Sequence, residues 1–328
     1  MRTFSLYTTV FFVSMLLNGC FLSSSPTKKW LIEPNGATAF GLSRDARFAL
    51  TYSDENQIVL WDLKENKLLA HLGPLDQQKS TVSFIKISDN ERYAVTASQT
   101  TFSVWDLAWS QSKGLWSISD ALIRDIDISN DGQQVLLGLS NGKAIYVDLV
   151  SGRRLEFLAH QEKVNSVAIS PNGQYALSGG NDYKAYFWST KTGQILETFP
   201  HDQRIVRVAL QRDGEYAFTS DGGNSGKIWS LKTGKKISEL HSFARQLIFS
   251  FARFSDDGKR LVTGTPASQL ILWDTLSGDK IDEFTVEAKK DTRPQSAVVY
   301  DAAFSSEHKI VSGSSSGIAE AWEISGKK

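Results

Sequence analysis

The sequence predicts an all-β fold in which seven similar four-stranded antiparallel sheets form a closed ring, a seven-bladed β-propeller. Three observations lead to this prediction. A Trp-centred landmark recurs seven times, the same succession of short alternating runs and turns precedes each landmark, and no window has the sustained 3.6-residue apolar period of a helix. A chain of 328 residues also exceeds the size at which a single hydrophobic core usually stops growing, so its length alone is compatible with two compact domains or with one repeat architecture.

The landmark is the dipeptide Trp-Asp or a variant of it, and its copies are separated by 41 to 49 residues. This period is typical of propeller blades of about 40–45 residues. The seven copies are Trp61-Asp62, Trp105-Asp106, Val147-Asp148, Trp188-Ser189, Trp229-Ser230, Trp273-Asp274 and Trp322-Glu323.

The residues before each landmark follow one pattern, which is clearest between Val164 and Ser189. The alternating run VNSVAIS is followed by the turn PNG, a second run QYALSGG, the loop NDY and a third run KAYFWS. Alternation over four to eight residues, bounded by Gly, Asn and Asp, predicts strands joined by tight turns. ISDNERYAVTAS, ISNDGQQVLLGLS and FSDDGKRLVTG repeat this pattern elsewhere in the chain.

These repeats resemble the WD-repeat family over residues 28–326. Individual repeats depart from the family pattern, since the third lacks Trp and the seventh lacks Asp. The resemblance implies a fourth, outer strand after each landmark. Six such strands are expected, at Lys67–His71, Leu115–Ser119, Arg154–Leu158, Gln194–Phe199, Lys235–Leu240 and Lys280–Thr285.

The seventh blade has no room for its own outer strand, because only six residues follow Trp322. The segment Lys29–Glu33 has strand character and precedes the first blade. We therefore expect this segment to complete blade seven, which closes the ring and removes an exposed sheet edge.

The first 19 residues predict a lipoprotein signal peptide. Arg2 provides a positive charge, and the interrupted apolar run from Phe4 to Leu17 is too short for a membrane-spanning helix. Leu17-Asn18-Gly19-Cys20 resembles a bacterial lipobox, which implies cleavage before Cys20 and acylation, including palmitate, on that residue. Two or more acyl chains would give a stable membrane anchor. An ordinary signal peptide with an incidental cysteine is the alternative.

The predicted domain organisation is therefore a signal peptide (1–19), a lipid-anchored tether (20–27) and one propeller (28–328). By the same resemblance, the absence of Asp after the cysteine favours the outer membrane, on its periplasmic side, after secretion across the inner membrane. The seven tether residues that follow Cys20, 21–27, span at most about 25 Å, so the propeller would lie close to the membrane.

Composition limits the other classes of function. Lys plus Arg and Asp plus Glu number 36 each, and a neutral chain gives no reason to expect nucleic acid as a partner. The single cysteine excludes an internal disulfide and a Cys-rich metal site. No phosphate-binding loop, zinc-protease motif or nucleophile elbow occurs, so we expect no enzyme, cofactor or metal.

The histidines are the first candidates for chemistry, but repeat position favours a structural role. His71, His160, His201 and His241 are spaced by multiples of the repeat and precede an innermost strand. In the family, this position holds a His bonded to a loop Asp, a strand Ser or Thr and the landmark Trp. One repeat matches the family pattern in full, with His160, Ser178, Asp182 and Trp188. Trp109 and Trp116 lie outside the landmarks, and we expect Trp116 to pack in the core.

Connections into the innermost strands are the best candidates for a binding face, because loops on a rigid scaffold often carry function. At the register of Asn165, the repeats present residues that include Arg124 and Tyr300. Arg207 lies one position further along its strand, together with Asp125 and Asp301 in their own repeats. The candidate partner-binding residues are Arg124, Lys163, Arg204, Arg207 and Tyr300. The guanidinium groups of the three arginines suit carboxylates, so an acidic peptide or another anionic partner is a candidate.

The predicted function is a non-enzymatic scaffold or adaptor for protein binding, tethered to the bacterial envelope, whose partner is an unidentified envelope protein or peptide. The alternative is an envelope enzyme or small-ligand-binding propeller that uses the central channel. Carboxylates converging on the channel would favour this alternative, and Asp125 and Asp301 are its scattered candidates. The sequence leaves the oligomeric state open.

Overall fold

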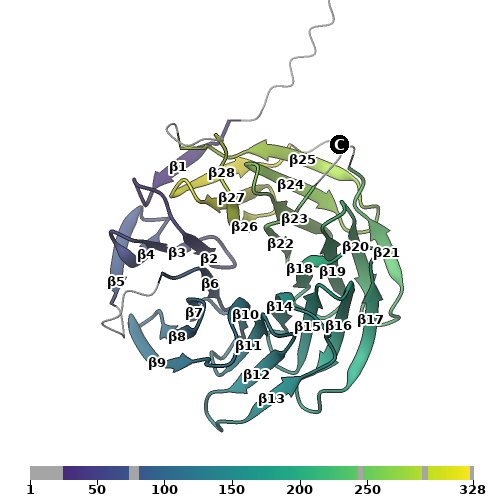
Figure 1. The fold of residues 1–328 in the computed structure, drawn as a ribbon. Helices are drawn as coiled ribbons and strands as arrows, with labels where there is room; N and C mark the ends of the chain where they lie inside the picture. Colours follow the sequence, from purple (N-terminus) through teal and green to yellow (C-terminus); the bar gives the residue numbers. More distant parts are fainter. Residues whose placement is uncertain (1–24, 74–80, 243–246, 290–294, 326–328) are drawn as a thin grey trace, which may run out of the picture.

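The computed structural model describes residues 25–73, 81–242, 247–289 and 295–325. These residues form seven four-stranded antiparallel sheets that are arranged as blades around a central axis (Figure 1). The predicted all-β, seven-bladed propeller is confirmed. In blades 1 to 6 the strands follow chain order from the axis outward, so the first strand is innermost and the fourth is outermost. In blade 7 the outermost strand comes instead from the N-terminal end of the described chain.

The strand bounds, blade by blade, are as follows. Blade 1 comprises β2 (Ala39–Leu42), β3 (Phe48–Ser53), β4 (Gln57–Asp62) and β5 (Lys67–Leu72), and blade 2 comprises β6 (Phe84–Ile87), β7 (Tyr93–Ala97), β8 (Thr101–Asp106) and β9 (Gln111–Ser117). Blade 3 comprises β10 (Ile123–Ile128), β11 (Gln134–Leu139), β12 (Ala144–Asp148) and β13 (Arg154–Phe157). Blade 4 comprises β14 (Val164–Ile169), β15 (Tyr175–Gly180), β16 (Lys184–Ser189) and β17 (Ile195–Pro200). Blade 5 comprises β18 (Ile205–Leu210), β19 (Tyr216–Asp221), β20 (Gly226–Ser230) and β21 (Lys236–Glu239). Blade 6 comprises β22 (Phe251–Phe254), β23 (Arg260–Gly264), β24 (Gln269–Asp274) and β25 (Lys280–Thr285), and blade 7 comprises β26 (Val299–Ser306), β27 (Lys309–Ser314), β28 (Ile318–Glu323) and β1 (Lys28–Leu31).

Side chains within the turns determine where the strands of each blade reverse. In blade 3, the Ser129 hydroxyl donates to Asp131 at 2.7 Å, and the same carboxylate accepts the Gln133 backbone N–H at 3.0 Å. Gly132, at φ 65°, takes the left-handed conformation that this turn requires. The Ser-x-Asp-Gly pattern of blade 3 recurs in blade 6, where Ser255 donates to Asp257 and the same carboxylate accepts the Lys259 backbone N–H, so both turns are held by contacts within the turn itself.

Alternating strand directions give the ring two different faces. The connection face carries the connections between blades and the turns between second and third strands. The turn face carries the turns between first and second strands and between third and fourth strands, such as residues 107–110. Because every blade repeats the same order of antiparallel strands, equivalent turns lie on the same face in all blades.

β1 closes the ring, as the sequence predicts. It pairs with β28 in antiparallel register, with Lys28 opposite Ala321 and Leu31 opposite Ile318 (Figure 1). The strand is slightly shorter than the expected Lys29–Glu33, since Ile32 and Glu33 turn away and donate their backbone N–H groups to Gly317. Gly317, at φ 79°, allows this approach because a Cβ there would collide with the Glu33 carbonyl.

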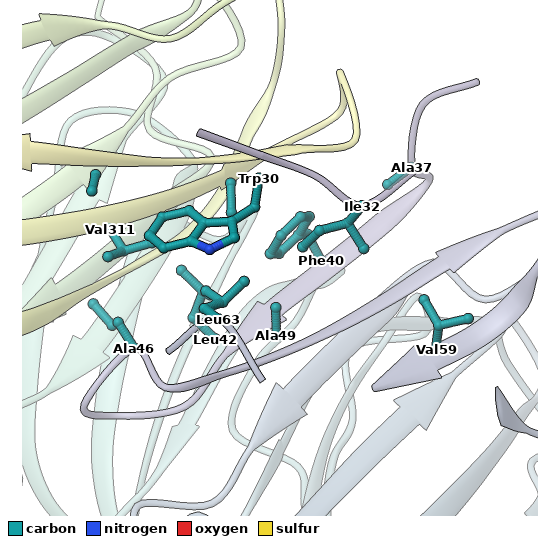
Figure 2. Close-up of a cluster of buried hydrophobic side chains, with 13 residues drawn as sticks. Trp30, Ile32, Ala37, Phe40, Leu42, Ala46, Ala49, Val59, Leu63 and Val311 are labelled. Carbon is teal, nitrogen blue, oxygen red and sulfur yellow. The ribbon is translucent and has the colours of Figure 1, made fainter. Parts of the chain in front are cut away.

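Trp30 and Glu33 fasten the closing segment to its neighbours. Trp30 is buried in a cluster that joins blades 7 and 1 and includes Phe40 and Val311 (Figure 2). The Glu33 carboxylate is 1 % exposed. It accepts hydrogen bonds from Thr51 at 2.9 Å, Ser53 at 2.8 Å and Asn56 at 2.8 Å, all in blade 1 or its hairpin turn. A buried carboxylate is stable only with such donors, so Glu33 fits this position between blades 7 and 1 because blade 1 supplies them.

The outer strands agree with the prediction except at their ends. The largest difference is β9, which starts at Gln111 instead of Leu115, because a tight turn after the landmark lets Gln111 pair directly with Asp106. Of the six landmark tryptophans, Trp61 is only partly buried. The described residues contain no helix long and apolar enough to cross a membrane.

Candidate functional site

A hydrogen-bonded set in blade 4 connects β15 and β16 to the loop between them and to the connection that enters the blade. His160 Nδ1 lies 3.0 Å from Asp182, and its Nε2 lies 2.9 Å from the Ser178 hydroxyl. Trp188 Nε1 donates to the same hydroxyl at 3.2 Å. His160, Ser178 and Trp188 are buried, so the four predicted residues form an internal brace away from solvent.

Blade 5 contains a second complete set that the sequence analysis missed. His201 Nδ1 lies 3.0 Å from Asp221, its Nε2 lies 2.7 Å from Thr219, and Trp229 donates to Thr219 at 2.7 Å. Burial lowers the pKa of His201, and the hydrogen bond that the Asp221 carboxylate accepts acts in the opposite direction. The neutral ring is therefore favoured, as a structural role requires.

The expectation that His71 and His241 occupy the same structural position was wrong. His71 lies in the outer strand β5 and is exposed. His241 is exposed and pairs with Asp279 at 3.0 Å, an ion pair between blades 5 and 6. His71 is part of β5 and His241 follows β21, so equal spacing along the sequence did not give these two side chains the place that His160 and His201 occupy.

β-Bulges shape the connection face at the register identified from the sequence. The first strands of blades 3, 4, 5 and 7 each have an irregularity there, so that Arg124, Asn165, Val206 and Tyr300 have no partner in the second strand. A bulge leaves one residue unpaired and redirects its side chain. Asn165 donates to the Ile205 carbonyl of the next blade at 2.7 Å and lies 3.4 Å from Arg124, which it positions.

Four of the five candidate binding residues surround one hollow of about 530 Å³ on the connection face. No carboxylate occurs among the described residues that line it. Arg124, Lys163 and Arg204 are exposed. Its lining comprises Ser83, Phe84, Gln99, Ile123, Arg124, Lys163, Asn165, Asn181, Arg204, Val206 and Arg207.

Tyr300 does not line this hollow, and its place in the candidate face is corrected accordingly. It is half-buried and packs against the cluster around Trp30. Burial raises the pKa of its hydroxyl. The apolar joint between blades 7 and 1 draws this aromatic ring inward, which a register comparison alone does not reveal.

Arg207 differs from the other three cations of the hollow because it forms an ion pair with Asp125. It contacts Asp125 of blade 3 at 3.2 Å, although the two residues are 82 positions apart in the sequence. Asp125 also accepts hydrogen bonds from the Ser166 hydroxyl at 2.9 Å and the Val167 backbone at 3.0 Å. One carboxylate thereby joins blades 3, 4 and 5.

Asp301 forms the corresponding joint on the other side of the ring. It accepts Arg253 at 2.8 Å and the backbone N–H of Leu42 at 2.9 Å, which links blades 7, 6 and 1. Asp125 and Asp301 are 3 % and 2 % exposed. The two carboxylates that were candidates for channel chemistry are thus engaged in structural pairs.

Toward the turn face, two further ion pairs cross the channel. Arg44 of blade 1 contacts Asp256 of blade 6 through two nitrogens, at 2.8 and 2.6 Å. Arg212 of blade 5 lies 3.7 Å from Asp89 of blade 2. These groups line a cavity of about 140 Å³ inside the channel.

Asp127 is the unusual acid of this cavity. Burial raises the pKa of its carboxyl to about 6, while Lys86 and the backbone N–H groups of Ile169 and Ile128 act in the opposite direction. No group of three or more His, Cys, Asp or Glu side chains in the described part of the chain is placed to hold a metal ion.

The remaining candidates have clear positions. Trp116 is partly buried and stacks on Phe102, with ring centroids 5.3 Å apart. Trp109 is 71 % exposed. Cys20, the predicted site of lipidation, lies outside the described residues.

Residues 152–189 match the family model for the WD domain, G-beta repeat. This segment spans the outer strand of blade 3 and the first three strands of blade 4, including the complete set around His160. The match and the seven-bladed ring together support a WD-repeat propeller. A comparison with curated proteins gave no match.

Proposed function

We propose that this propeller is a non-enzymatic interaction platform, anchored to the bacterial envelope through a lipid on Cys20, that receives acidic segments of envelope proteins. The WD-repeat fold is commonly a scaffold for protein interactions, although fold alone does not fix function. The observation that carries the proposal is the hollow of the connection face, which is lined by four cations and by no carboxylate within the described residues.

The chemistry of the hollow favours a carboxylate-bearing partner. Arg124, Lys163 and Arg204 are exposed, and Arg side chains bind carboxylates through paired hydrogen bonds. Asn165 and Asn181, which are hydrogen-bonded to each other at 2.7 Å, add polar groups at the base.

The channel alternative, an enzyme or a binder of small ligands, has weaker support. Its carboxylates Asp125 and Asp301 are each held by an arginine and by backbone N–H groups. A carboxylate that is fully engaged in this way is a poor general base, because taking up a proton would break these contacts.

The test is crosslinking in living cells followed by recovery of the full-length protein. Arg124→Glu combined with Arg204→Glu should reduce the yield of specific envelope partners at least about tenfold. Arg207 is left intact, because reversing its charge would place a second carboxylate beside Asp125.

The matched control is Lys184→Glu combined with Lys227→Glu, which reverses two cations of blade 4 and blade 5 outside the hollow. The control should keep its partners, and Cys20→Ser should lose those that require the membrane. Equal recovery with the hollow variant and the control would refute the hollow as the binding site. Recovery of no specific partner by the unaltered protein would refute the platform itself.

A further inference from the structure

The turns between third and fourth strands have an unusual composition at their tips. Three tips present an apolar side chain that is largely exposed: Trp109 in blade 2 at 71 %, Val150 in blade 3 at 74 % and Leu276 in blade 6 at 61 %. Exposed tryptophan, valine and leucine at loop tips serve no purpose in the ring itself, since each blade packs through its other residues.

The other three tips present lysines. Lys64, Lys191 and Lys232 follow the landmarks of blades 1, 4 and 5 by three residues, as Val150 and Leu276 follow theirs. All three lysines are exposed and, within the described residues, none has a side-chain partner. Apolar and cationic tips are thus distributed around one face.

The seventh position of the same rim is where the N-terminal segment enters. Blade 7 has no turn between its third and fourth strands, since β1 comes from the other end of the chain. Thr27 donates its backbone N–H to Ala321 at 2.8 Å, and Lys28 lies opposite Ala321 near the turn-face end of β28. The segment that leads back toward Cys20 therefore leaves from the turn face.

Several acidic groups of the turn face are engaged within its inner turns, whereas Glu65, in the tip of blade 1 beside Lys64, is exposed. Asp45, Asp131 and Asp257 each accept a backbone N–H of their own turn, from Arg47, Gln133 and Lys259. Asp256 pairs with Arg44. The lysine tips on the outer rim thus remain available to anionic groups.

We propose that the turn face is a membrane-contacting surface that lies on an anionic phospholipid bilayer. Trp109, Val150 and Leu276 enter the interface, and the lysine tips approach the headgroups. The inference rests on the proposed lipid anchor, because seven tether residues reach at most about 25 Å and keep the ring near the bilayer. The connection face, with its basic hollow, consequently points away from the lipid toward soluble partners.

Blade 3 offers a matched pair of reporter positions at the two ends of one strand. Val150 precedes β13 on the turn face, and Leu158, 66 % exposed, follows β13 on the connection face. Val150→Cys and Leu158→Cys place a single reactive thiol at each site, because the only native cysteine is the proposed acylated one. Leu276→Cys and Leu122→Cys form a second pair, with Leu276 in blade 6 and Leu122 in the connection between blades 2 and 3.

Each variant of the full lipidated protein is labelled with a fluorophore and inserted in phosphatidylethanolamine–phosphatidylglycerol vesicles that contain nitroxide-bearing lipids. The fluorescence at positions 150 and 276 should be quenched several-fold more than at 158 and 122. Equal quenching at both ends of β13, or stronger quenching at 158, overturns the proposal. Quenching at 150 without quenching at 276 also overturns it, because only the rim at blade 3, and not the whole turn face, would then contact the bilayer.

The mass of the N-terminal peptide shows whether Cys20 carries a lipid. It therefore distinguishes an error in the proposed lipid anchor from an error in the proposed membrane-contacting surface. If Cys20 carries no lipid, the anchoring step of the proposed function is wrong, and the labelled variants are then made with Cys20→Ser, which keeps a single reactive thiol, and are mixed with the same vesicles as soluble protein. Quenching at 150 and 276 in that form would support the membrane surface on its own, and its absence would overturn it.

Discussion

At the residue scale, the hydroxyl beneath the landmark Trp is the contact that recurs most in this propeller. In five blades a buried Ser or Thr accepts the indole N–H of the landmark, at 2.7 to 3.2 Å. Blades 4 and 5 add a histidine to the same hydroxyl, which then connects two buried side chains. The added histidine brings in an Asp, from a loop in blade 4 and from the end of β19 in blade 5.

Ser178→Ala in blade 4 should therefore destabilise the protein more than Ser312→Ala in blade 7. Both serines are buried and both accept a Trp N–H, but only Ser178 also contacts a histidine. We expect a loss of about 2–3 kcal/mol for Ser178→Ala and about 1 kcal/mol for Ser312→Ala, because the first change leaves two buried polar groups without a partner. Urea unfolding of both variants measures the difference, and equal losses would refute the proposed cooperation within the set.

At the scale of elements, the closing strand is the joint on which the ring depends. β1 supplies the fourth strand of blade 7 and brings Trp30 into the core shared with blade 1. Glu33, just after the strand, accepts three side-chain hydrogen bonds from blade 1. Without this segment, the third strand of blade 7 would be an open edge and the carboxylate-binding pocket of blade 1 would be empty.

Deleting residues 28–34 should lower the melting temperature of the entire ring instead of fraying one end. Trp30→Ala should reproduce part of this effect, with a loss of about 3–5 kcal/mol, because it leaves a cavity in the core. Leu31→Ala in the same strand is the control, since Leu31 is 60 % exposed and its truncation should change stability little. Calorimetry that found the deletion variant as stable as the complete protein would contradict this role of β1.

At the scale of the whole molecule, charged pairs connect blades that are distant in the sequence. Arg207 joins Asp125 across two blades, and Arg44 joins Asp256 across the gap between blades 1 and 6. These pairs fill the channel from both sides, while the hollow on the connection face keeps its cations exposed. The ring thus presents a braced interior and two chemically distinct faces.

The channel should also make the stability of the ring depend on pH through Asp127. Its pKa of about 6 in the folded protein exceeds the value near 3.9 that an unfolded chain would have. Between these values the folded state holds more protons, so its stability falls as pH rises from about 4 to about 6. This effect amounts to at most about 3 kcal/mol.

Asp127→Asn removes the titrating group but leaves the other acids and His201 in place. As pH rises from about 4 to about 6, the unaltered protein should lose unfolding free energy relative to this variant. Chemical denaturation at several pH values measures it. A difference that stays constant from pH 4 to pH 7 would mean that the Asp127 carboxyl keeps an ordinary pKa.

The blade 5 set shows why sequence spacing found one hydrogen-bonded set and missed another. His160 and Asp182 are 22 residues apart, whereas His201 and Asp221 are 20 apart. The acid comes from a loop in blade 4 and from the end of β19 in blade 5. Two backbone positions can therefore deliver a carboxylate to the same imidazole nitrogen, and only the folded hairpin reveals which one does. Conversely, His71 and His241 have the regular spacing, but neither contacts the hydroxyl beneath a landmark Trp as His160 and His201 do.

The sequence by itself determined the seven blades, the four strands of each and the closing strand, because these depend on local alternation, turn residues and the repeat period. It also located the cations Arg124, Lys163, Arg204 and Arg207 on one sector. Only the tertiary structure decided which of them is paired, since Asp125 reaches Arg207 across two blades. Side chains from different repeats meet only after the ring closes, and no period along the chain specifies those contacts.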